Sequence, residues 1–163
     1  MPILAQGDMF FTPFEPKQSN RFYVSALEGV PGYLVKGVSA ISLAQSSVAL
    51  NHINVQRYVK GKTIWQPITF TLYESITPSG AQAVMEWVRL GHESVTGRDG
   101  YSDFYKKDIT LNTLGPVGDM VGEWKIQGAV ITSVNFGDYN WDDDGTVVNI
   151  TVEVQPDYCI LNY

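Results

Sequence analysis

The sequence of 163 residues contains a single cysteine and no long apolar run. Because Cys159 has no second cysteine to pair with, an intramolecular disulfide is excluded, which suits a protein made in a reducing cytoplasm. No stretch approaches the roughly 18 consecutive apolar residues of a membrane-spanning helix. The opening MPILAQGDMF has neither a basic start nor an apolar core long enough for a secretion signal. We therefore expect no membrane anchoring.

Residues that commonly carry catalysis are equally scarce. His52 and His92 stand in different contexts, and Cys159 lies in a terminal apolar stretch without an electropositive neighbour to activate its thiol. The sequence contains no HExxH, no paired CxxC and no nucleophile elbow. Residues 61–63 read GKT, like the end of a phosphate loop, but Gln56 stands where that loop needs a glycine, and a strand pattern surrounds it. We expect no enzyme, no cofactor and no metal.

Basic charge is also in short supply, and its distribution is uneven. The net charge is −6, and residues 101–163 carry three Lys and Arg against ten Asp and Glu, a net charge of −7. Tight DNA binding needs Lys and Arg side chains that displace counterions from phosphates. The sequence is therefore not that of a protein that holds DNA tightly.

The residues that are present are typical of a folded, strand-rich chain. With 44% hydrophobic and 17% charged residues, residues 1–163 suit a single domain. An irregular arm with three prolines is expected over residues 1–20. Strand patterns follow at residues 21–28, 33–44, 48–59, 63–74, 104–114, 123–136 and 146–158. Many strands without a βαβ rhythm predict a mainly β fold, a β-barrel-like sandwich.

One flanking helix is expected over residues 77–91. Thr77 is a plausible N-cap, Pro78 suits the first helical position and Gly91 suits the end of the helix. The apolar residues recur at helical spacing and predict a face packed on the sheet. They are Ala81, Val84, Met85 and Val88.

A long protruding hairpin is expected over residues 48–74. Its two strands flank KGK at residues 60–62, which we interpret as a tight glycine turn. Pro67 has no N–H for a ladder, so its part of the second strand is expected at an edge or a bend.

The stretch DYNWDDDGT, residues 138–146, allows two interpretations. Asn140, Asp142 and Asp144 followed by Gly145 resemble the start of a calcium loop, but the twelfth position is Thr151 rather than a bidentate glutamate. Strand patterns rather than helices flank it. Asp and Gly are equally the residues of a tight hairpin turn. We favour a hairpin end with a solvated acidic tip, which together with Trp141 would make a contact surface.

Two segments resemble a known family. NHINVQRYVKGKTIWQPITFTLYESITPSGAQAVMEWV, residues 51–88, looks like the central part of the tail tube proteins of contractile-tailed bacteriophages of the T-even type, including a second strand that contains a tryptophan. WDDDGTVVNITVEVQPDY, residues 141–158, is similar to their final hairpin, and Tyr23 lies where the family has its first strand. The pattern spans most of the chain. The longer N-terminal arm and the additional residues 159–163 depart from it, and leave open a main tube subunit, an initiator, a hub or a terminator protein.

The resemblance implies a structural subunit that forms hexameric rings, which stack into a hollow tube inside a contractile sheath. The implied partners are further copies of the chain, the tail sheath protein, the baseplate hub or tube initiator, and the tape-measure and tail terminator proteins. Double-stranded DNA is implied as transient cargo in the bore during genome ejection. The implied location is the tail of a virion that is assembled in the bacterial host cytoplasm. The alternatives are the tube of a type VI secretion or phage-derived injection particle, and a calcium-dependent β-sandwich binding module.

Oppositely charged segments offer a candidate contact between copies. Stacked identical rings need a heterologous interface, in which one surface meets a different surface of the next copy. A basic hairpin tip and the acidic stretch could form such a pair, and would set register and association rate more than affinity. The alternative is two solvated segments that never meet. The candidate inter-subunit residues are Arg57, Lys60, Lys62, Trp65, Asp138, Trp141, Asp142, Asp143 and Asp144.

Overall fold

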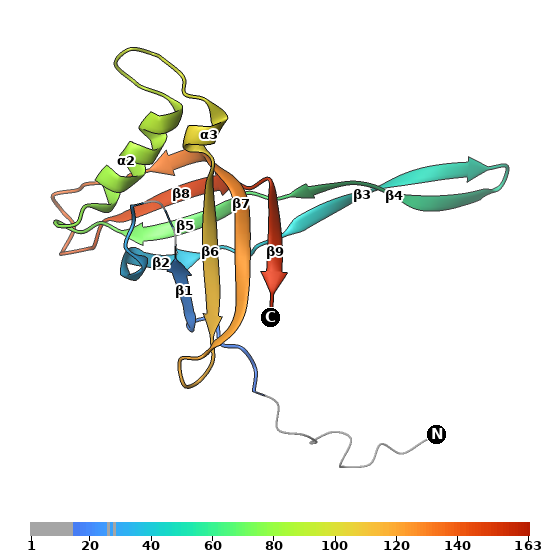
Figure 1. The fold of residues 1–163 in the computed structure, drawn as a ribbon, viewed down its shortest axis with the longest axis horizontal. Helices are drawn as coiled ribbons and strands as arrows, with labels where there is room; N and C mark the ends of the chain where they lie inside the picture. The colour runs from blue at the N-terminus through green and yellow to red at the C-terminus, as the bar shows by residue number, and fades with distance from the viewer. Residues whose placement is uncertain (1–14, 26, 28) are drawn as a thin grey trace.

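The computed structural model describes residues 15–25, 27 and 29–163 (Figure 1). Most of the expected irregular arm lies outside these residues, and residues 15–20 form neither helix nor strand. In chain order the elements are β1 (Phe22–Ser25), the 3-10 helix η1 (Gly32–Leu34), β2 (Val35–Val38), β3 (Leu43–His52), β4 (Val55–Trp65), β5 (Ile68–Tyr73), α2 (Gly80–Gly91), α3 (Ser102–Tyr105), β6 (Lys107–Leu114), β7 (Met120–Asn135), β8 (Asn149–Gln155) and β9 (Tyr158–Asn162). None of the helices in the described part of the chain has the length and apolar character needed to cross a membrane.

The strands form one large antiparallel sheet and one separate hairpin. The large sheet has seven strands in the order β1-β6-β7-β8-β5-β2, with β9 also paired to β7. Figure 1 shows β1, β6, β9 and most of β7 running across the direction of β8, β5 and β2. The mainly β fold with one long flanking helix is therefore confirmed, although β1 and β2, the two ends of the sheet, do not pair to close a barrel.

Alternating apolar residues fill the space inside the curved sheet. The register pairs Ile68 with Val154, Phe70 with Val152 and Leu72 with Ile150, and all six side chains are buried. Each such side chain contributes about 1.5–3 kcal/mol of transfer free energy when it leaves water. The alternation expected for residues 146–158 is thus confirmed in β8. One buried face on each strand is what the period-2 pattern predicts when one face of a sheet is covered.

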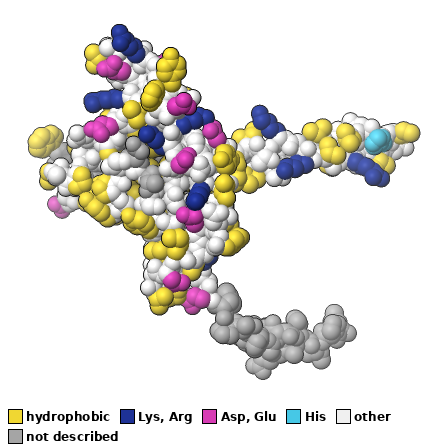
Figure 2. Space-filling model, in the orientation of Figure 1, with side chains coloured by type: hydrophobic (Ala, Val, Ile, Leu, Met, Phe, Trp, Pro, Cys, Tyr) yellow, Lys and Arg dark blue, Asp and Glu magenta, His cyan; other side chains and the backbone are white. Residues whose placement is uncertain are grey.

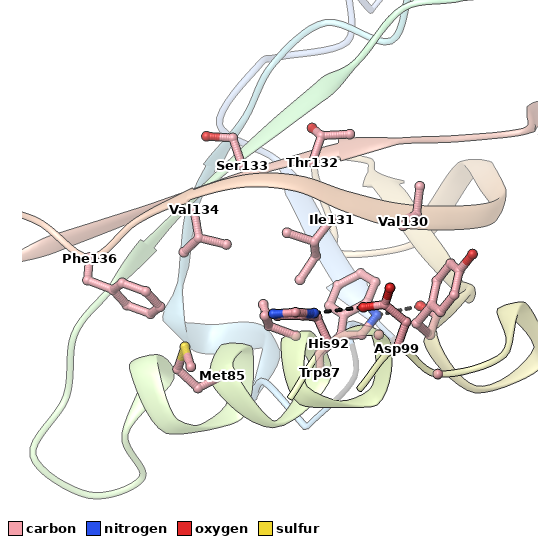
Figure 3. Close-up of a pocket in the computed structure, with 14 residues that line it drawn as sticks. Met85, Trp87, His92, Asp99, Val130, Ile131, Thr132, Ser133, Val134 and Phe136 are labelled. Carbon is pink, nitrogen blue, oxygen red and sulfur yellow. Dashed lines mark hydrogen bonds and ion pairs between the residues drawn. The ribbon is translucent and has the colours of Figure 1, made fainter. Parts of the chain in front are cut away.

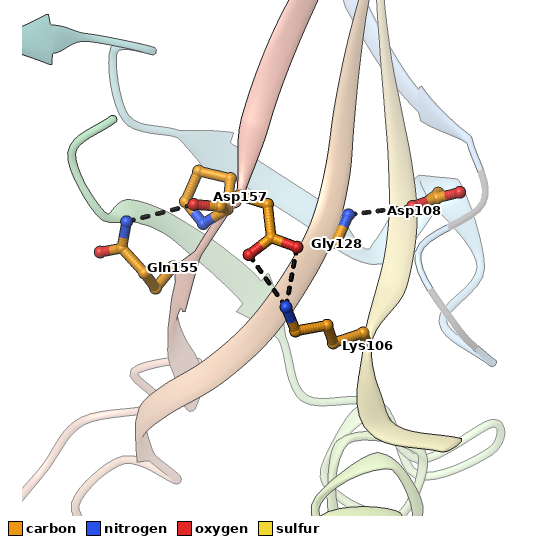
Figure 4. A network of polar contacts seen from close by, with 6 residues as sticks. Lys106, Asp108, Gly128, Gln155 and Asp157 are labelled. Carbon is orange, nitrogen blue, oxygen red and sulfur yellow. Dashed lines mark hydrogen bonds and ion pairs between the residues drawn. The ribbon is translucent and has the colours of Figure 1, made fainter. Parts of the chain in front are cut away.

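A glycine corner lets β7 serve two parts of the sheet. Gly128 has φ +63°, and a Cβ at this position would collide with the carboxylate of Asp157. In Figure 4, the Gly128 N–H donates to Asp108 Oδ1 at 3.0 Å, and Lys106 Nζ donates to the two Asp157 oxygens at 3.0 and 2.8 Å. Only glycine adopts this conformation at no steric cost, so the corner is specified by the sequence.

Helix α2 begins later than the sequence indicates. Ser79, not Thr77, is the N-cap, and its hydroxyl accepts from the Gln82 N–H at 3.3 Å. Glu74 holds this end as well, because it accepts from the Ser79 hydroxyl and the Ala81 N–H. Pro78 therefore lies before the helix. The predicted end at Gly91 is confirmed.

The buried face of α2 differs in part from the predicted stripe. Val84 is buried, whereas Ala81, Met85 and Val88 are half-buried. The largest buried side chain of the helix is Trp87, whose indole Nε1 donates to the Tyr105 carbonyl at 2.6 Å. This bond fixes the short helix α3 against α2.

Candidate functional site

The hairpin of β3 and β4 projects from the body as a two-stranded sheet (Figures 1 and 2). Every residue of β3 is exposed, and so are all but two of β4. The base is anchored, because Gln155 Nε2 donates to the Trp65 carbonyl at 2.8 Å and Trp65 packs against the core. An isolated two-stranded hairpin is marginally stable in water.

The turn of this hairpin is not where the sequence indicated. The strands reverse at Ile53 and Asn54, and the first pair beyond the turn is His52 with Val55. Ile53 has φ +36° and is fully exposed, although a β-branched residue disfavours positive φ. The expected turn at residues 60–62, and with it a basic tip formed by Lys60 and Lys62, is wrong.

Residues 60–62 instead form a bulge within β4. The register passes from Gln45–Thr63 to Ser47–Lys60, so that Gly61 and Lys62 both lie opposite Ser46. The Lys62 N–H donates to Ser46 Oγ at 2.9 Å, and a Cβ at Gly61 would collide with that oxygen. Glycine is needed here for close approach rather than for a turn, since bulges often carry glycine. Pro67 lies at a bend between β4 and β5, as predicted.

The outer half of the hairpin has one apolar and one polar face. Directly paired residues share a face of a sheet. One face carries Val48 paired with Val59, Leu50 with Arg57 and His52 with Val55. The opposite face carries Asn51 paired with Gln56, whose side-chain amides hydrogen-bond at 2.8 Å, and Tyr58 donates to Gln56 Oε1 at 3.0 Å.

The apolar face of the hairpin is uncovered. Val48, Leu50, Val55 and Val59 are 42–60% exposed. The basic residues of this segment were predicted contact residues, whereas these four were not. Within the described residues Arg57, Lys60 and Lys62 form no ion pair.

The acidic stretch lies in residues 136–148, which connect the antiparallel neighbours β7 and β8. It is therefore a solvated hairpin end, as expected, but a long loop rather than a tight turn. Its candidate contact residues are all exposed: Asp138, Trp141, Asp142, Asp143 and Asp144. Asn140 makes a local turn, accepting from the Asp142 N–H through Oδ1 at 3.1 Å and from the Asp143 N–H through its carbonyl at 3.3 Å. Figure 1 shows this connection at the end of the body away from the hairpin. The basic and acidic sets therefore do not meet within one copy.

No group of three or more His, Cys, Asp or Glu side chains in the described residues is arranged to hold a metal ion. Because Thr151 stands where a calcium loop needs a bidentate glutamate, we expect calcium at millimolar concentration, compared with excess chelator, to leave the melting temperature unchanged to within about 1 °C; a ligand raises the melting temperature only by binding the folded state. Differential scanning fluorimetry measures this directly. An increase of several degrees with calcium would contradict the expectation and restore the calcium-loop interpretation.

A groove of about 520 Å³ lies between α2 and the second half of β7 (Figure 3). Apolar side chains line most of it, including Met85, Val88, Ile131, Val134 and Phe136. At one side His92 Nδ1 lies 2.7 Å from Asp99 Oδ1, and both side chains are exposed. His92 is thus a surface partner of Asp99.

The cysteine does not form a reactive site. Cys159 lies on β9 and is buried. Burial raises the pKa of its thiol to about 11, so the thiol is neutral at pH 7. A thiol without thiolate character is a poor nucleophile.

Comparisons with known proteins identify the fold. No protein-family model and no curated protein sequence matches the chain. Among solved structures, a chain of the sheath–tube complex of an extracellular contractile injection system in its extended state is 16% identical. The match has a TM-score of 0.71 and covers 90% of this chain and 91% of that chain. A chain in the structure of the anti-feeding prophage cap, its tube-terminating cap, is 15% identical, with a TM-score of 0.74, and the match covers 98% of this chain and 99% of that chain.

A third structure, Hcp1 from Flavobacterium johnsoniae, is 13% identical with a TM-score of 0.53, and the match covers 86% of this chain and 93% of that one. The chain therefore has the fold shared by components of contractile injection systems and by Hcp1. This is the fold class that the resemblance implied.

Proposed function

We propose that the chain is a structural subunit of the inner tube of a contractile injection machine, in which hexameric rings stack into a hollow tube. The observation that carries this proposal is the projecting β3–β4 hairpin, whose apolar residues stay exposed in one copy. Exposed apolar area of this kind marks a protein-interaction site. The fold and the hairpin together support a self-assembling part rather than an enzyme.

In its finer form, the proposal is a tail tube of a contractile phage, with residues 1–163 as one domain. Its partners would be the sheath, the baseplate hub or initiator, and the tape-measure and terminator proteins. DNA would pass through the bore during ejection, and assembly would take place in the host cytoplasm. The injection particle is the alternative within this class, favoured by TM-scores above 0.7 with chains of such particles.

A tube terminator is the second candidate function. The similarity to the tube-terminating cap, which covers 98% of this chain, favours it. A terminator would form one ring and stop, whereas a tube subunit would continue to stack, because its interface repeats without closing along the axis.

Negative-stain electron microscopy of the purified, concentrated chain tests the proposal. Hollow rings that stack into tubes support the tube subunit, and rings that stay single support the terminator. Folded protein that remains monomeric at high concentration would contradict both.

We further propose that the basic residues of β4 face the acidic connection of a neighbouring copy. Lys60→Glu combined with Lys62→Glu would then block stacking and leave the monomer folded, since like charges oppose association. Lys60→Gln with Lys62→Gln is the matched variant and would give an intermediate effect. Light scattering against time at low and high salt measures the association. Normal stacking by the glutamate variant would reject the pairing.

A further inference from the structure

Part of β7 has an edge without a neighbouring strand. Along one edge, β7 pairs with β9 and then, from Val130 to Asn135, with β8. Along the other edge, β7 pairs with β6 only up to Ala129. Because β6 begins at Lys107, no strand of the described residues continues along the edge that β6 leaves. An open edge presents unpaired N–H and C=O groups that can accept another strand.

The open edge borders the groove against α2. Figure 3 shows the side chains of Ile131 and Val134 directed toward the helix, and those of Thr132 and Ser133 directed away from it. A strand added at this edge would continue both faces of the sheet. It would therefore need apolar side chains toward α2 and polar side chains on the other side.

The outer half of the hairpin has the two faces that this edge requires. Its apolar face carries Val55 and Val59 on β4, and its polar face carries Gln56 and Tyr58 on the same strand. The free outer edge of β4 is available, since within the described residues β4 pairs with β3 alone.

Charge favours the same pairing. Residues 43–65 contain Arg57, Lys60 and Lys62 and no acidic residue. Figure 2 shows basic and hydrophobic side chains along the hairpin, whereas the body carries acidic and basic side chains together. The rest of the sequence carries eight Lys and Arg against seventeen Asp and Glu, a net charge of −9. In the groove, the exposed carboxylate of Asp99 lies 2.7 Å from His92 Nδ1. Opposite charges of this kind guide the encounter and fix the register of an interface.

The hairpin extends away from the body and cannot enter the groove of its own copy (Figure 1). We propose that the outer β4 strand of one copy adds to the open edge of β7, residues 130–135, in a second copy. Its apolar face fills the groove against α2. The contact is heterologous, so every copy offers one hairpin and one groove to different neighbours. This inference rests on the proposed function, and locates one receptor surface for self-assembly.

Substitutions on the two faces of one strand test the hairpin. Val55→Asp combined with Val59→Asp is expected to weaken self-association by about 100-fold, because each substitution places a charge in an apolar contact and removes roughly a factor of ten. Gln56→Asp with Tyr58→Asp adds the same charge on the polar face and is the matched control. It is expected to assemble nearly as wild type. Sedimentation velocity over a concentration series measures both.

Val134→Asp tests the groove in the same way, because the Val134 side chain is directed toward α2, and it is expected to weaken self-association. Ser133→Asp is the matched control, because the Ser133 side chain is directed away from the helix. If Val134→Asp loses its circular dichroism spectrum, Met85→Asp on the opposite wall replaces it. The decisive measurement mixes the hairpin variant with the groove variant. The first keeps an intact groove and the second an intact hairpin, so the mixture is expected to form complexes that contain both variants, detected by native mass spectrometry.

The outcomes separate this inference from the proposed function. Wild-type protein that forms rings, with hairpin and groove variants that assemble equally well, would overturn the inference and leave the proposed function standing. The same holds if the control pair weakens assembly as strongly as the test pair. Folded variants that do not combine when mixed, while wild type assembles, would also overturn it. Wild-type protein that never assembles would overturn both.

Discussion

Replacing residues 46–62 by an Asn-Gly turn is expected to leave the body folded and to abolish rings and tubes. The cut falls between Gln45 and Thr63, which are paired, so the two-residue turn closes the shortened hairpin in a favoured geometry. None of the buried core residues lies in the removed segment. The melting temperature is therefore expected to change by less than about 4 °C, the shift that 1 kcal/mol produces in a domain of this size.

Assembly should respond in the opposite way. The removed segment contains the uncovered apolar face and all three basic residues of the hairpin. The shortened copies therefore lack the surface that we propose joins them. Circular dichroism measures folding and electron microscopy measures assembly. Rings formed by the shortened chain would contradict the proposed role of the hairpin in assembly. An unfolded body would contradict the expectation that the body folds without the hairpin.

Trp87→Ala is expected to destabilise the body by about 3–5 kcal/mol, the range for removing a buried large aromatic side chain. The indole is 3% exposed and belongs to the buried core cluster. Its loss also removes the donor to the Tyr105 carbonyl, which tethers α3. Chemical denaturation of the monomer measures the free energy of unfolding.

Two further substitutions separate packing from hydrogen bonding at this position. Trp87→Phe keeps most of the buried area and is expected to cost about 1–2 kcal/mol for the unpaired carbonyl and the smaller ring. Glu86→Ala, on the neighbouring exposed position, is expected to stay within about 0.5 kcal/mol. A loss for Trp87→Ala that is no larger than for Glu86→Ala would contradict the packing described for α2.

Local sequence patterns predicted the elements in which buried and exposed residues alternate regularly. In β8, Ile150, Val152 and Val154 alternate with more exposed residues, and a strand with one buried face produces that alternation. Strand β9 was missed because Pro156 and Asp157 read as the end of a strand. In the structure they are a bend, after which the chain continues along β7.

The hairpin shows why glycine alone is a weak guide to a turn. Gly61 is required by the side chain of Ser46 across the ladder, a contact that no local pattern reveals. The actual turn uses Ile53 in a conformation that its type disfavours, so its composition gave no signal. The same error placed Lys60 and Lys62 at the tip rather than along the strand.

The candidate contact surface was predicted in its charges and missed in its apolar part. Arg57 was recognisable from the sequence because its charge stands out in a strand segment. Val48, Leu50, Val55 and Val59 looked like ordinary core residues, since alternation does not say whether a second layer covers the face. Only the topology shows that β3 and β4 pair with each other and leave that face open.

Hydrogen–deuterium exchange of the hairpin, compared between assembled and dilute monomeric protein, tests the central claim most directly. In the monomer a two-stranded sheet without a covering layer should exchange rapidly, whereas a hairpin covered by a neighbouring copy is protected. We predict that amides of residues 43–65 exchange more slowly by at least about tenfold on assembly, while those of β5 and β8 stay unchanged. Equal exchange of the hairpin in both states, with rings present, would show that this surface does not join the copies and would contradict the account.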